Sequence, residues 1–273
     1  MHPSPPSHVR PPAVAGSFYP ARTDLLRDTV GKLLARADPP LVEGALRALI
    51  VPHAGYVYSG AVAATAYAAL SRDGLARSVA ILGPSHFVRL VGIAVSGATD
   101  WQTPLGLVPV DDELRERTVQ AGGAVDDRFH AVDHALEVQL PFLQRCWNAA
   151  FRILPVAVGA ESATATAALI GALVPDALVV VSTDLSHYHD AASARRLDRA
   201  TAEAVVALDA QAIGDGDACG ADALRGLLVH ARLAGWTCTL LDLRTSADTA
   251  GDSDRVVGYG AFAFSSEPEE AGA

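Results

Sequence analysis

The chain has 273 residues and a net charge of −10; half of its residues are hydrophobic and only 19% are charged. Such a composition can bury a large core, which excludes a mainly disordered chain. The negative charge argues against non-specific binding to nucleic acid or to an anionic membrane surface, because no surplus of cations is left to neutralise phosphates.

Cysteine and lysine usage narrow the class of protein further. The three cysteines, Cys146, Cys219 and Cys238, have no regular spacing, so they do not indicate a disulfide framework. The first residues lack the apolar stretch of a signal peptide, and no window approaches the ~20 apolar residues of a membrane span. Lys32 is the only lysine and is followed by leucine, so no phosphate-binding P-loop is present. We expect a cytoplasmic, prokaryotic protein.

Hydrophobic patterning predicts one α/β domain over residues 10–265, between a flexible arm at 1–9 and an acidic tail at 266–273. Continuous apolar runs predict strands at 46–51, 78–82, 91–96, 152–158, 177–182, 237–243 and 256–264. Helical periodicity falls at 22–37, 60–70, 111–120, 133–147, 162–173, 190–209 and 221–234. Apolar strands alternating with helices indicate a sheet covered by helices on both faces, and closely spaced strands favour a mixed sheet.

Three predicted strands lead to a histidine. ALIVPH ends at His53, VAILGPSH at His86 and LVVVSTDLSH at His187. One histidine after a strand is usually a hydrogen-bonded turn residue, but three such endings predict a site, because ligands bind beyond the carboxyl ends of strands in open α/β sheets. Imidazole suits zinc, copper and iron, and general acid–base catalysis is the alternative role.

Two further segments carry candidate site residues. In HAVDHALEVQLPFL, helical spacing would put His130, His134 and Glu137 on one face. The alternative is an exposed polar first turn, which stays open for His134 and is favoured for His130. Cys219 precedes a predicted helix, and a helix N-terminus lowers thiol pKa values and favours the thiolate that binds metals.

Two smaller features leave alternatives open. Asp184 lies three residues before His187, where it could orient an imidazole, bind a metal or serve only as a turn or cap residue. In PHAGYVYSG, glycine lets the chain turn towards the following helix. Tyr56 and Tyr58 in this stretch either line the pocket or pack beneath it.

Taken together and in order, six segments resemble the Memo protein family. They are RPPAVAGSFYPA, PHAGYVYSG, LGPSHF, DHALEVQLPFL, STDLSHY and CGADALRGLL, and they span nearly the whole chain. The resemblance implies the fold of class III extradiol dioxygenases, a single-domain α/β/α sandwich around a mixed sheet with a metal pocket at one sheet edge.

The same resemblance implies the roles of individual residues. His53, His86 and Cys219 match the metal ligands of the family, and thiolate in place of the glutamate of the dioxygenases shifts the metal preference towards softer ions such as copper. His187, with Asp184 beside it, resembles the dioxygenase acid–base residue, and His134 resembles a further pocket histidine. The implied cofactor is iron or copper, with zinc also possible.

The resemblance implies a redox-active metalloprotein, an iron- or copper-dependent oxidase-like or dioxygenase-like protein that acts on a small molecule or a peptide. One alternative is a non-catalytic binding or adaptor module with a relic pocket. Another is a metal-dependent hydrolase, against which a required Cys219 thiolate argues. AMMECR-type and radical-SAM-type proteins are the partners that the family implies, with no nucleic acid or membrane.

Overall fold

The computed structural model describes residues 8–70, 78–147, 150–174, 176–250 and 252–267. Its strands are β1 (Val9–Arg10), β2 (Ala45–Val51), β3 (Ser78–Gly83), β4 (Ile93–Val95), β5 (Asp100–Thr103), β6 (Gly106–Pro109), β7 (Ala124–Val125), β8 (Arg152–Val158), β9 (Ala177–Ser182), β10 (His187–His189), β11 (Thr237–Thr245) and β12 (Val256–Ser266). Its α-helices are α1 (Thr23–Arg36), α2 (Tyr56–Ala68), α3 (Asp112–Gln120), α4 (Leu140–Cys146), α5 (Ala163–Leu173), α6 (Ala191–Val206) and α7 (Ala221–Leu233). Short 3-10 helices are η1 (Asp127–Phe129), η2 (Glu137–Gln139), η3 (Ala210–Ala212) and η4 (Ser246–Asp248).

A nine-stranded mixed sheet organises the fold. Its order is β10-β12-β2-β9-β3-β8-β4-β7, with β11 paired to β12. The four central strands β2, β9, β3 and β8 are parallel, whereas β12 and β4 run antiparallel to their neighbours β2 and β8. This confirms the predicted mixed sheet. A second, three-stranded sheet, β1-β5-β6, lies outside it.

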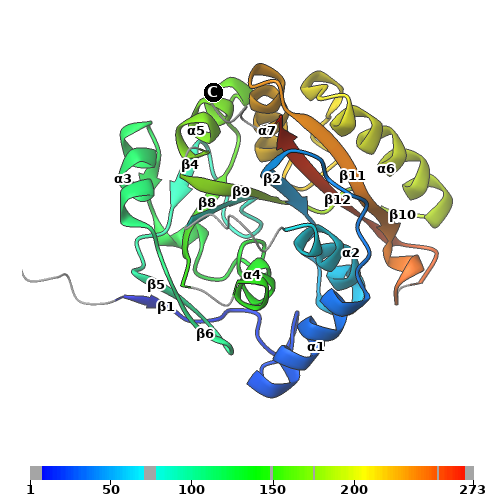
Figure 1. Ribbon diagram of the computed structural model, residues 1–273, viewed down its shortest axis with the longest axis horizontal. Coiled ribbons are helices and arrows are strands. Elements are labelled where there is room, and N and C mark those ends of the chain that lie inside the picture. Colours follow the sequence, from blue (N-terminus) through cyan, green and yellow to red (C-terminus); the bar gives the residue numbers. More distant parts are fainter. Residues whose placement is uncertain (1–7, 71–77, 148–149, 175, 251, 268–273) are drawn as a thin grey trace, which may run out of the picture.

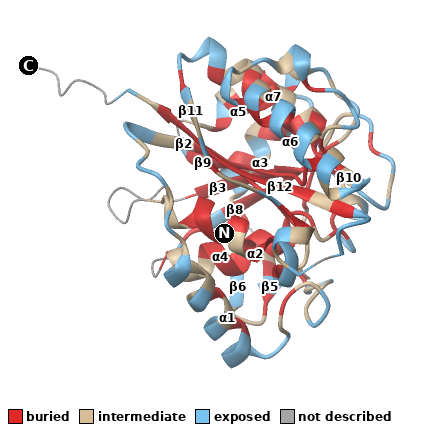
Figure 2. Cartoon of the chain, turned by 90° about the vertical axis from the view of Figure 1, so that its right-hand side faces the viewer, coloured by how far each residue is buried: buried red, intermediate tan, exposed pale blue. Residues whose placement is uncertain are grey.

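Helices cover both faces of the large sheet, because successive side chains of each strand point to opposite sides. In β2, Leu49 and Val51 join the core with α1, α2 and α4, whereas Ala48 and Ile50 join the core with α5, α6 and α7. Figure 1 shows these two groups of helices on opposite sides of the sheet. In Figure 2, the strands between them are mostly buried and the outer faces of the helices are exposed. The predicted three-layer α/β/α sandwich is therefore confirmed.

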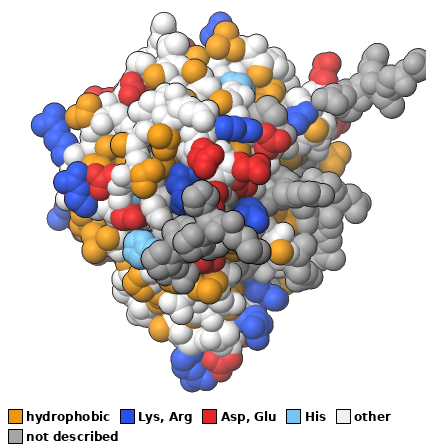
Figure 3. Space-filling view, turned by 90° about the vertical axis from the view of Figure 1, so that its left-hand side faces the viewer, with side chains coloured by type: hydrophobic (Ala, Val, Ile, Leu, Met, Phe, Trp, Pro, Cys, Tyr) orange, Lys and Arg blue, Asp and Glu red, His pale blue; other side chains and the backbone are white. Residues whose placement is uncertain are grey.

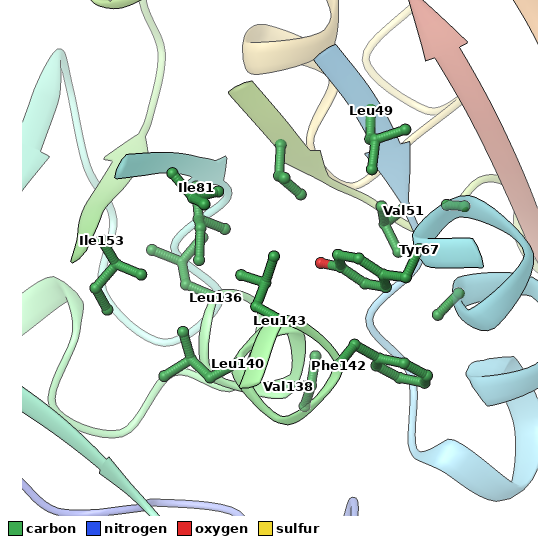
Figure 4. Packing of buried hydrophobic residues seen from close by; sticks show 14 of the residues in the cluster. Leu49, Val51, Tyr67, Ile81, Leu136, Val138, Leu140, Phe142, Leu143 and Ile153 are labelled. Carbon is green, nitrogen blue, oxygen red and sulfur yellow. The ribbon is translucent and has the colours of Figure 1, made fainter. Parts of the chain in front are cut away.

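The core on the α2–α4 side is densely packed. Figure 4 shows Leu49, Val51 and Ile81 facing the cluster that Tyr67 and Leu143 complete, and all but Tyr67, which is 1% exposed, are fully buried. Full burial of each such aliphatic side chain contributes about 1.5–3 kcal/mol. This packing provides a rigid base for the strand ends.

The carboxyl ends of three central strands lie next to one another. β9 lies between β2 and β3, and Val51 at the end of β2 is in register with Ser182 at the end of β9. On the other side of β9, Leu82 of β3 is in register with Val181. The segments that follow these strands, which carry His53, Asp184 and His86, therefore leave the sheet at one edge.

The predicted helix at 133–147 is wrong in its first half. Residues 133–134 have no regular structure, and Ala135 and Leu136 form a turn in which the Asp133 carboxylate accepts the N–H of Ala135 (2.9 Å). The α-helix begins only at Leu140, so that Pro141 occupies its first turn, the one place where a missing N–H and a fixed ring are tolerated. His130 and His134 therefore do not share a helical face.

Other elements differ less from expectation. Helix α2 begins at Tyr56, four residues before the predicted start, so most of PHAGYVYSG is the first turns of a helix. β5 and β6 were not predicted, because strands of four residues are too short to show a clear periodicity. The predicted arm and tail lie largely outside the described residues, at 1–7 and 268–273, and their boundaries stay predictions.

Two features bear on the expectations from composition: the distribution of charged side chains on the surface, and the length and polarity of the helices. Among the described residues coloured on the face in Figure 3, acidic and basic side chains are interspersed. In the described part of the chain, no helix combines the length and apolar character needed to cross a membrane.

Candidate metal centre

Three histidine side chains meet beyond the ends of β2 and β3. One ligating atom from each of His53, His86 and His134 lies within 4.8 Å of the other two, the only arrangement of this kind formed by histidine, cysteine and acidic residues in the described chain. The His86 and His134 rings are stacked, with centroids 4.6 Å apart, and the His53 ring stands edge-on to both. The two strand-end histidines therefore lie together, and His134 reaches them from the loop before η2.

The environment favours the neutral form of two of these imidazoles, His53 and His134. Burial lowers the pKa of His53 well below its ordinary value, and the neighbouring His86 and His134 lower it further. Burial, with a smaller effect of His86, lowers the pKa of His134 to about 4. A neutral imidazole carries the lone pair that binds a metal ion, so His53 and His134 can bind an ion at neutral pH.

His53 is the most enclosed member of the cluster, with 1% of the residue exposed. Its Nδ1 lies 3.0 Å from the Ser182 hydroxyl at the end of β9. Its backbone N–H donates to the Asp184 carboxylate (2.7 Å), which fixes the turn after β2. Both partners come from the end of the adjacent strand.

His86 is held by Asp133. One carboxylate oxygen of Asp133 accepts the His86 backbone N–H (2.6 Å), and the other lies 3.2 Å from His86 Nδ1. Burial alone would raise the pKa of Asp133, but the hydrogen bonds from His86 and Ala135 outweigh it and lower the pKa to about 2. The His86 side chain keeps 27% exposure, so the cluster is open to solvent on this side.

Cys219 lies beside His53. Its Sγ is 3.2 Å from His53 Nε2 and accepts the backbone N–H of Asp184 at 3.2 Å. The expected thiolate is wrong for the metal-free chain: burial, together with the nearby Asp184 carboxylate, raises the pKa of Cys219 to about 12. Although Cys219 directly precedes the Gly220 cap of α7, loss of hydration outweighs the effect of the helix N-terminus.

Asp184 and His187 lie near the cluster but do not belong to the three-histidine group. The Asp184 carboxylate is 4% exposed, and burial raises its pKa to about 7 despite the bond from the His53 N–H. The hydrogen bond that this carboxylate accepts from the His53 N–H orients the backbone of His53. His187 begins β10, and burial, with a smaller effect of His86, lowers its pKa. The catalytic roles expected for these two residues and for His134 stay predictions.

The residue after His187 has an unusual backbone. Tyr188 has a φ of 63°, in the left-handed region that a non-glycine residue rarely adopts. Its ring is 65% exposed, and the Arg255 guanidinium lies 5.0 Å from the ring centroid. This conformation coincides with the irregular pairing of β10 with β12 between His187 and His189.

A buried ion pair fastens the loop that carries His134. Both carboxylate oxygens of Glu137 are occupied: Arg10 and the Ala13 N–H bind one, and the Tyr19 hydroxyl and the Val14 N–H bind the other. Arg10 also donates to the Asp133 carbonyl (2.8 Å) and stacks 4.1 Å from the centre of the Trp101 ring. The N-terminal segment therefore holds the loop from 130 to 137 in place.

The remaining candidates take structural positions. His130 is buried, not exposed as the alternative reading had it, and packs against Trp101 away from the cluster. Tyr56 packs beneath the site, where its hydroxyl donates to the Val138 carbonyl (2.6 Å). Tyr58 is 42% exposed.

Sequence reasoning missed Asp133 and Ser182. Asp133 directly precedes His134 in the DH dipeptide, and Ser182 is the one polar residue that ends the apolar run ALVVVS. Both positions were visible, but only the fold shows that they contact His86 and His53. Long-range hydrogen bonds of this kind leave no periodic pattern in the chain.

Comparison with known proteins adds to this geometry. Residues 10–263 match the profile of the family described as Memo-like protein. The chain is 36% identical to a MEMO1 family protein of Methanopyrus kandleri, over 93% of this chain and 98% of that protein. It is 35% identical to a MEMO1 family protein of Aquifex aeolicus, over 92% of this chain and 97% of that protein.

A solved structure of an uncharacterized protein from Escherichia coli K12 has a similar fold. Its TM-score is 0.51 at 14% sequence identity, over 78% of this chain and 99% of that one. At this identity the likeness concerns the fold alone.

Proposed function

The chain belongs to the Memo-like protein family, and from that premise we propose that it binds a transition-metal ion in the histidine cluster and uses it in redox chemistry. The observation that carries the proposal is the cluster of His53, His86 and His134, in which one ligating atom of each lies within 4.8 Å of the others. Neutral imidazoles in this arrangement are typical donors for iron, copper and zinc.

The proposed donor set combines nitrogen and sulfur. His53 and His86 supply imidazole nitrogen, His134 stands ready as a third nitrogen donor, and Cys219 offers sulfur 3.2 Å from His53 Nε2. Thiolate and imidazole select iron, copper or zinc over magnesium and calcium, which prefer oxygen. The residues present therefore fit an iron or copper ion.

A bound iron or copper ion would supply electron-transfer chemistry that protein side chains lack. Side chains of the protein itself would accept, hold and release the protons. His187, held neutral by burial, would accept a proton from a substrate at a ring nitrogen. Asp184, with a pKa raised to about 7 by burial, can hold or release a proton near neutral pH.

The substrate in this proposal is a small molecule or a peptide segment that enters beside His86. This histidine is the partly open member of the cluster, and Phe87 next to it is 64% exposed. Cytoplasmic location and association with AMMECR-type and radical-SAM-type proteins remain part of the proposal.

Metal analysis of protein purified without chelators tests the metal site. We expect bound iron, copper or zinc in the wild type, loss of the metal in His53→Ala, and retention in the control His230→Ala. His230 lies on α7 and packs against Trp236. A wild-type protein that binds none of these ions would refute the proposal.

Two measurements test the role of Cys219 as a ligand and the redox activity separately. If Cys219 is a ligand, the copper(II) form will show a thiolate-to-copper absorption band that Cys219→Ser lacks. Oxygen consumption by the metal-loaded protein with catechols or thiols tests redox turnover. A loaded protein that is inert with all of them would favour the binding-module alternative, and activity retained in Cys219→Asp would favour a hydrolase.

A further inference from the structure

Two histidines of the cluster have Nδ1 engaged by a residue that would not itself bind the ion. The Nδ1 atom of His53 contacts the Ser182 hydroxyl, and that of His86 contacts the Asp133 carboxylate. A neutral imidazole carries its proton on one nitrogen and its lone pair on the other, so the partner of Nδ1 decides which atom faces the cluster ready to bind.

The hydrogen bonds around Ser182 assign the tautomer of His53. The Ser182 hydroxyl has one proton, which it donates to the Ala135 carbonyl at 2.6 Å, an atom that can only accept. The Gln139 amide nitrogen donates to the same hydroxyl oxygen at 2.8 Å. The remaining position on that oxygen is an acceptor, so His53 Nδ1, at 3.0 Å, is the donor.

Two further hydrogen bonds fix the orientation of the Gln139 amide, and therefore which of its atoms faces Ser182. Its nitrogen also donates to the Pro52 carbonyl (3.0 Å), and its oxygen accepts the Tyr67 hydroxyl (2.9 Å). Turning the amide over would place its oxygen against a carbonyl. His53 Nε2 therefore bears the lone pair, and the Cys219 thiol, with Sγ at 3.2 Å, faces it as a donor.

Asp133 assigns the tautomer of His86 in the same way. Its two oxygens accept the backbone N–H groups of His86 (2.6 Å) and Ala135 (2.9 Å), as an ionised carboxylate does. An ionised carboxylate can only accept, so His86 Nδ1, 3.2 Å from the second oxygen, carries the proton. In the neutral form of His86 the lone pair is then on Nε2.

Both networks return to one segment, residues 133–139. It supplies the Asp133 carboxylate, the Ala135 carbonyl and the Gln139 amide, and it also carries His134. We propose that Ser182 and Asp133 are positioning residues that preset His53 and His86 in the Nδ1–H form, so that each presents Nε2 to a metal ion. This inference rests on the proposed metal function.

Histidine ¹⁵N NMR of the full-length, metal-free protein reads the tautomers directly. We expect protonated Nδ1 and unprotonated Nε2 for both His53 and His86. In Ser182→Ala, His53 should become a mixture of tautomers, and its zinc affinity should fall by about 10–100-fold, as for other residues that orient metal ligands. In Asp133→Asn the same changes should appear at His86.

Matched controls separate positioning from general damage to the fold. Ser265→Ala removes another buried strand serine, whose hydroxyl lies 3.2 Å from that of Thr237. Asp127→Asn alters a carboxylate of η1 that accepts the Gly97 N–H (2.9 Å). Both controls should leave the tautomers and the zinc affinity unchanged.

The outcomes distinguish the inference from the function on which it rests. A wild-type protein with His53 or His86 protonated on Nε2 overturns the positioning role, even if zinc binds. Unchanged tautomers in Ser182→Ala and Asp133→Asn overturn it too. A wild type with the expected tautomers that binds no zinc, iron or copper supports the assigned hydrogen bonds but refutes the metal function.

Discussion

The Glu137→Gln substitution tests how firmly the N-terminal segment holds the loop of the site. The carboxylate is fully buried, and each of its oxygens accepts two hydrogen bonds. A glutamine has only one acceptor oxygen. Whichever way its amide is turned, the NH₂ group therefore meets two donors, and the Arg10 charge stays buried without its partner.

The expected cost is large for a change of one atom. Removing one member of a buried ion pair typically costs about 3–5 kcal/mol. For a domain of this size, that corresponds to a fall in melting temperature of roughly 6–20 °C. Urea denaturation, followed by circular dichroism, would give the change in the free energy of unfolding, and a thermal scan the change in melting temperature.

An exposed ion pair supplies the control. Arg22 and Asp24 are paired at 2.5 Å, but their side chains are 76% and 69% exposed. Because solvent screens such pairs, Asp24→Asn should leave the melting temperature unchanged. If Glu137→Gln costs less than about 1 kcal/mol, the reasoning from its four donors is wrong.

Three further predictions concern pH, metal binding and packing. Burial lowers the pKa of His130 to about 4, so between pH 6.5 and 4 the unfolded chain binds a proton that the folded chain does not. Wild-type stability should therefore fall as the pH falls through this window, by ~2 kcal/mol at pH 5 from this group, and His130→Phe should remove that part in urea titrations. Because the Cys219 thiol is protonated at neutral pH, metal binding to its sulfur should release about one proton, measured by calorimetry in buffers of different ionisation heat, and Cys219→Ser should release almost none. Gly226→Ala should destabilise the protein, although alanine favours a helix, because the added Cβ would overlap the Thr166 side chain where α5 packs on α7; thermal unfolding measures this. Each has a clear contrary result: equal pH dependence in His130→Phe and wild type, equal proton release in Cys219→Ser, or a raised melting temperature in Gly226→Ala.

The arrangement of elements follows closely from local sequence. The run at 46–51 became β2 (Ala45–Val51), and the run at 177–182 became β9 (Ala177–Ser182), because a strand buried on both faces is apolar throughout. The runs at 46–51 and 78–82 also showed that His53 and His86 follow strands, and in a parallel sheet such positions fall at one edge. Fold and part of the site were therefore predictable.

What could not be predicted depends on contacts between distant parts of the chain. The strand order, with β9 between β2 and β3, decides that Ser182 meets His53, and no local pattern specifies which strands are neighbours. The lowered thiol pKa predicted for Cys219 was wrong for a similar reason, whereas its role as a metal ligand stays a prediction. A position before a helix lowers a thiol pKa only where water or positive charge also stabilises the thiolate, and here burial dominates.

The loop at 130–137 shows why the four-residue spacing of His130 and His134 led to a wrong prediction. Helical spacing predicts one face for His130 and His134, but the loop instead directs His130 towards Trp101 and His134 into the cluster. Residues 133–136 are loop and turn rather than helix, and within them the Ala135 N–H binds the Asp133 carboxylate. The departure from helix frees the Asp133 carboxylate to hold His86 and the Ala135 carbonyl to hold Ser182. The same irregular backbone that defeats periodicity is thus what allows one short segment to support two strand-end histidines and to contribute a third.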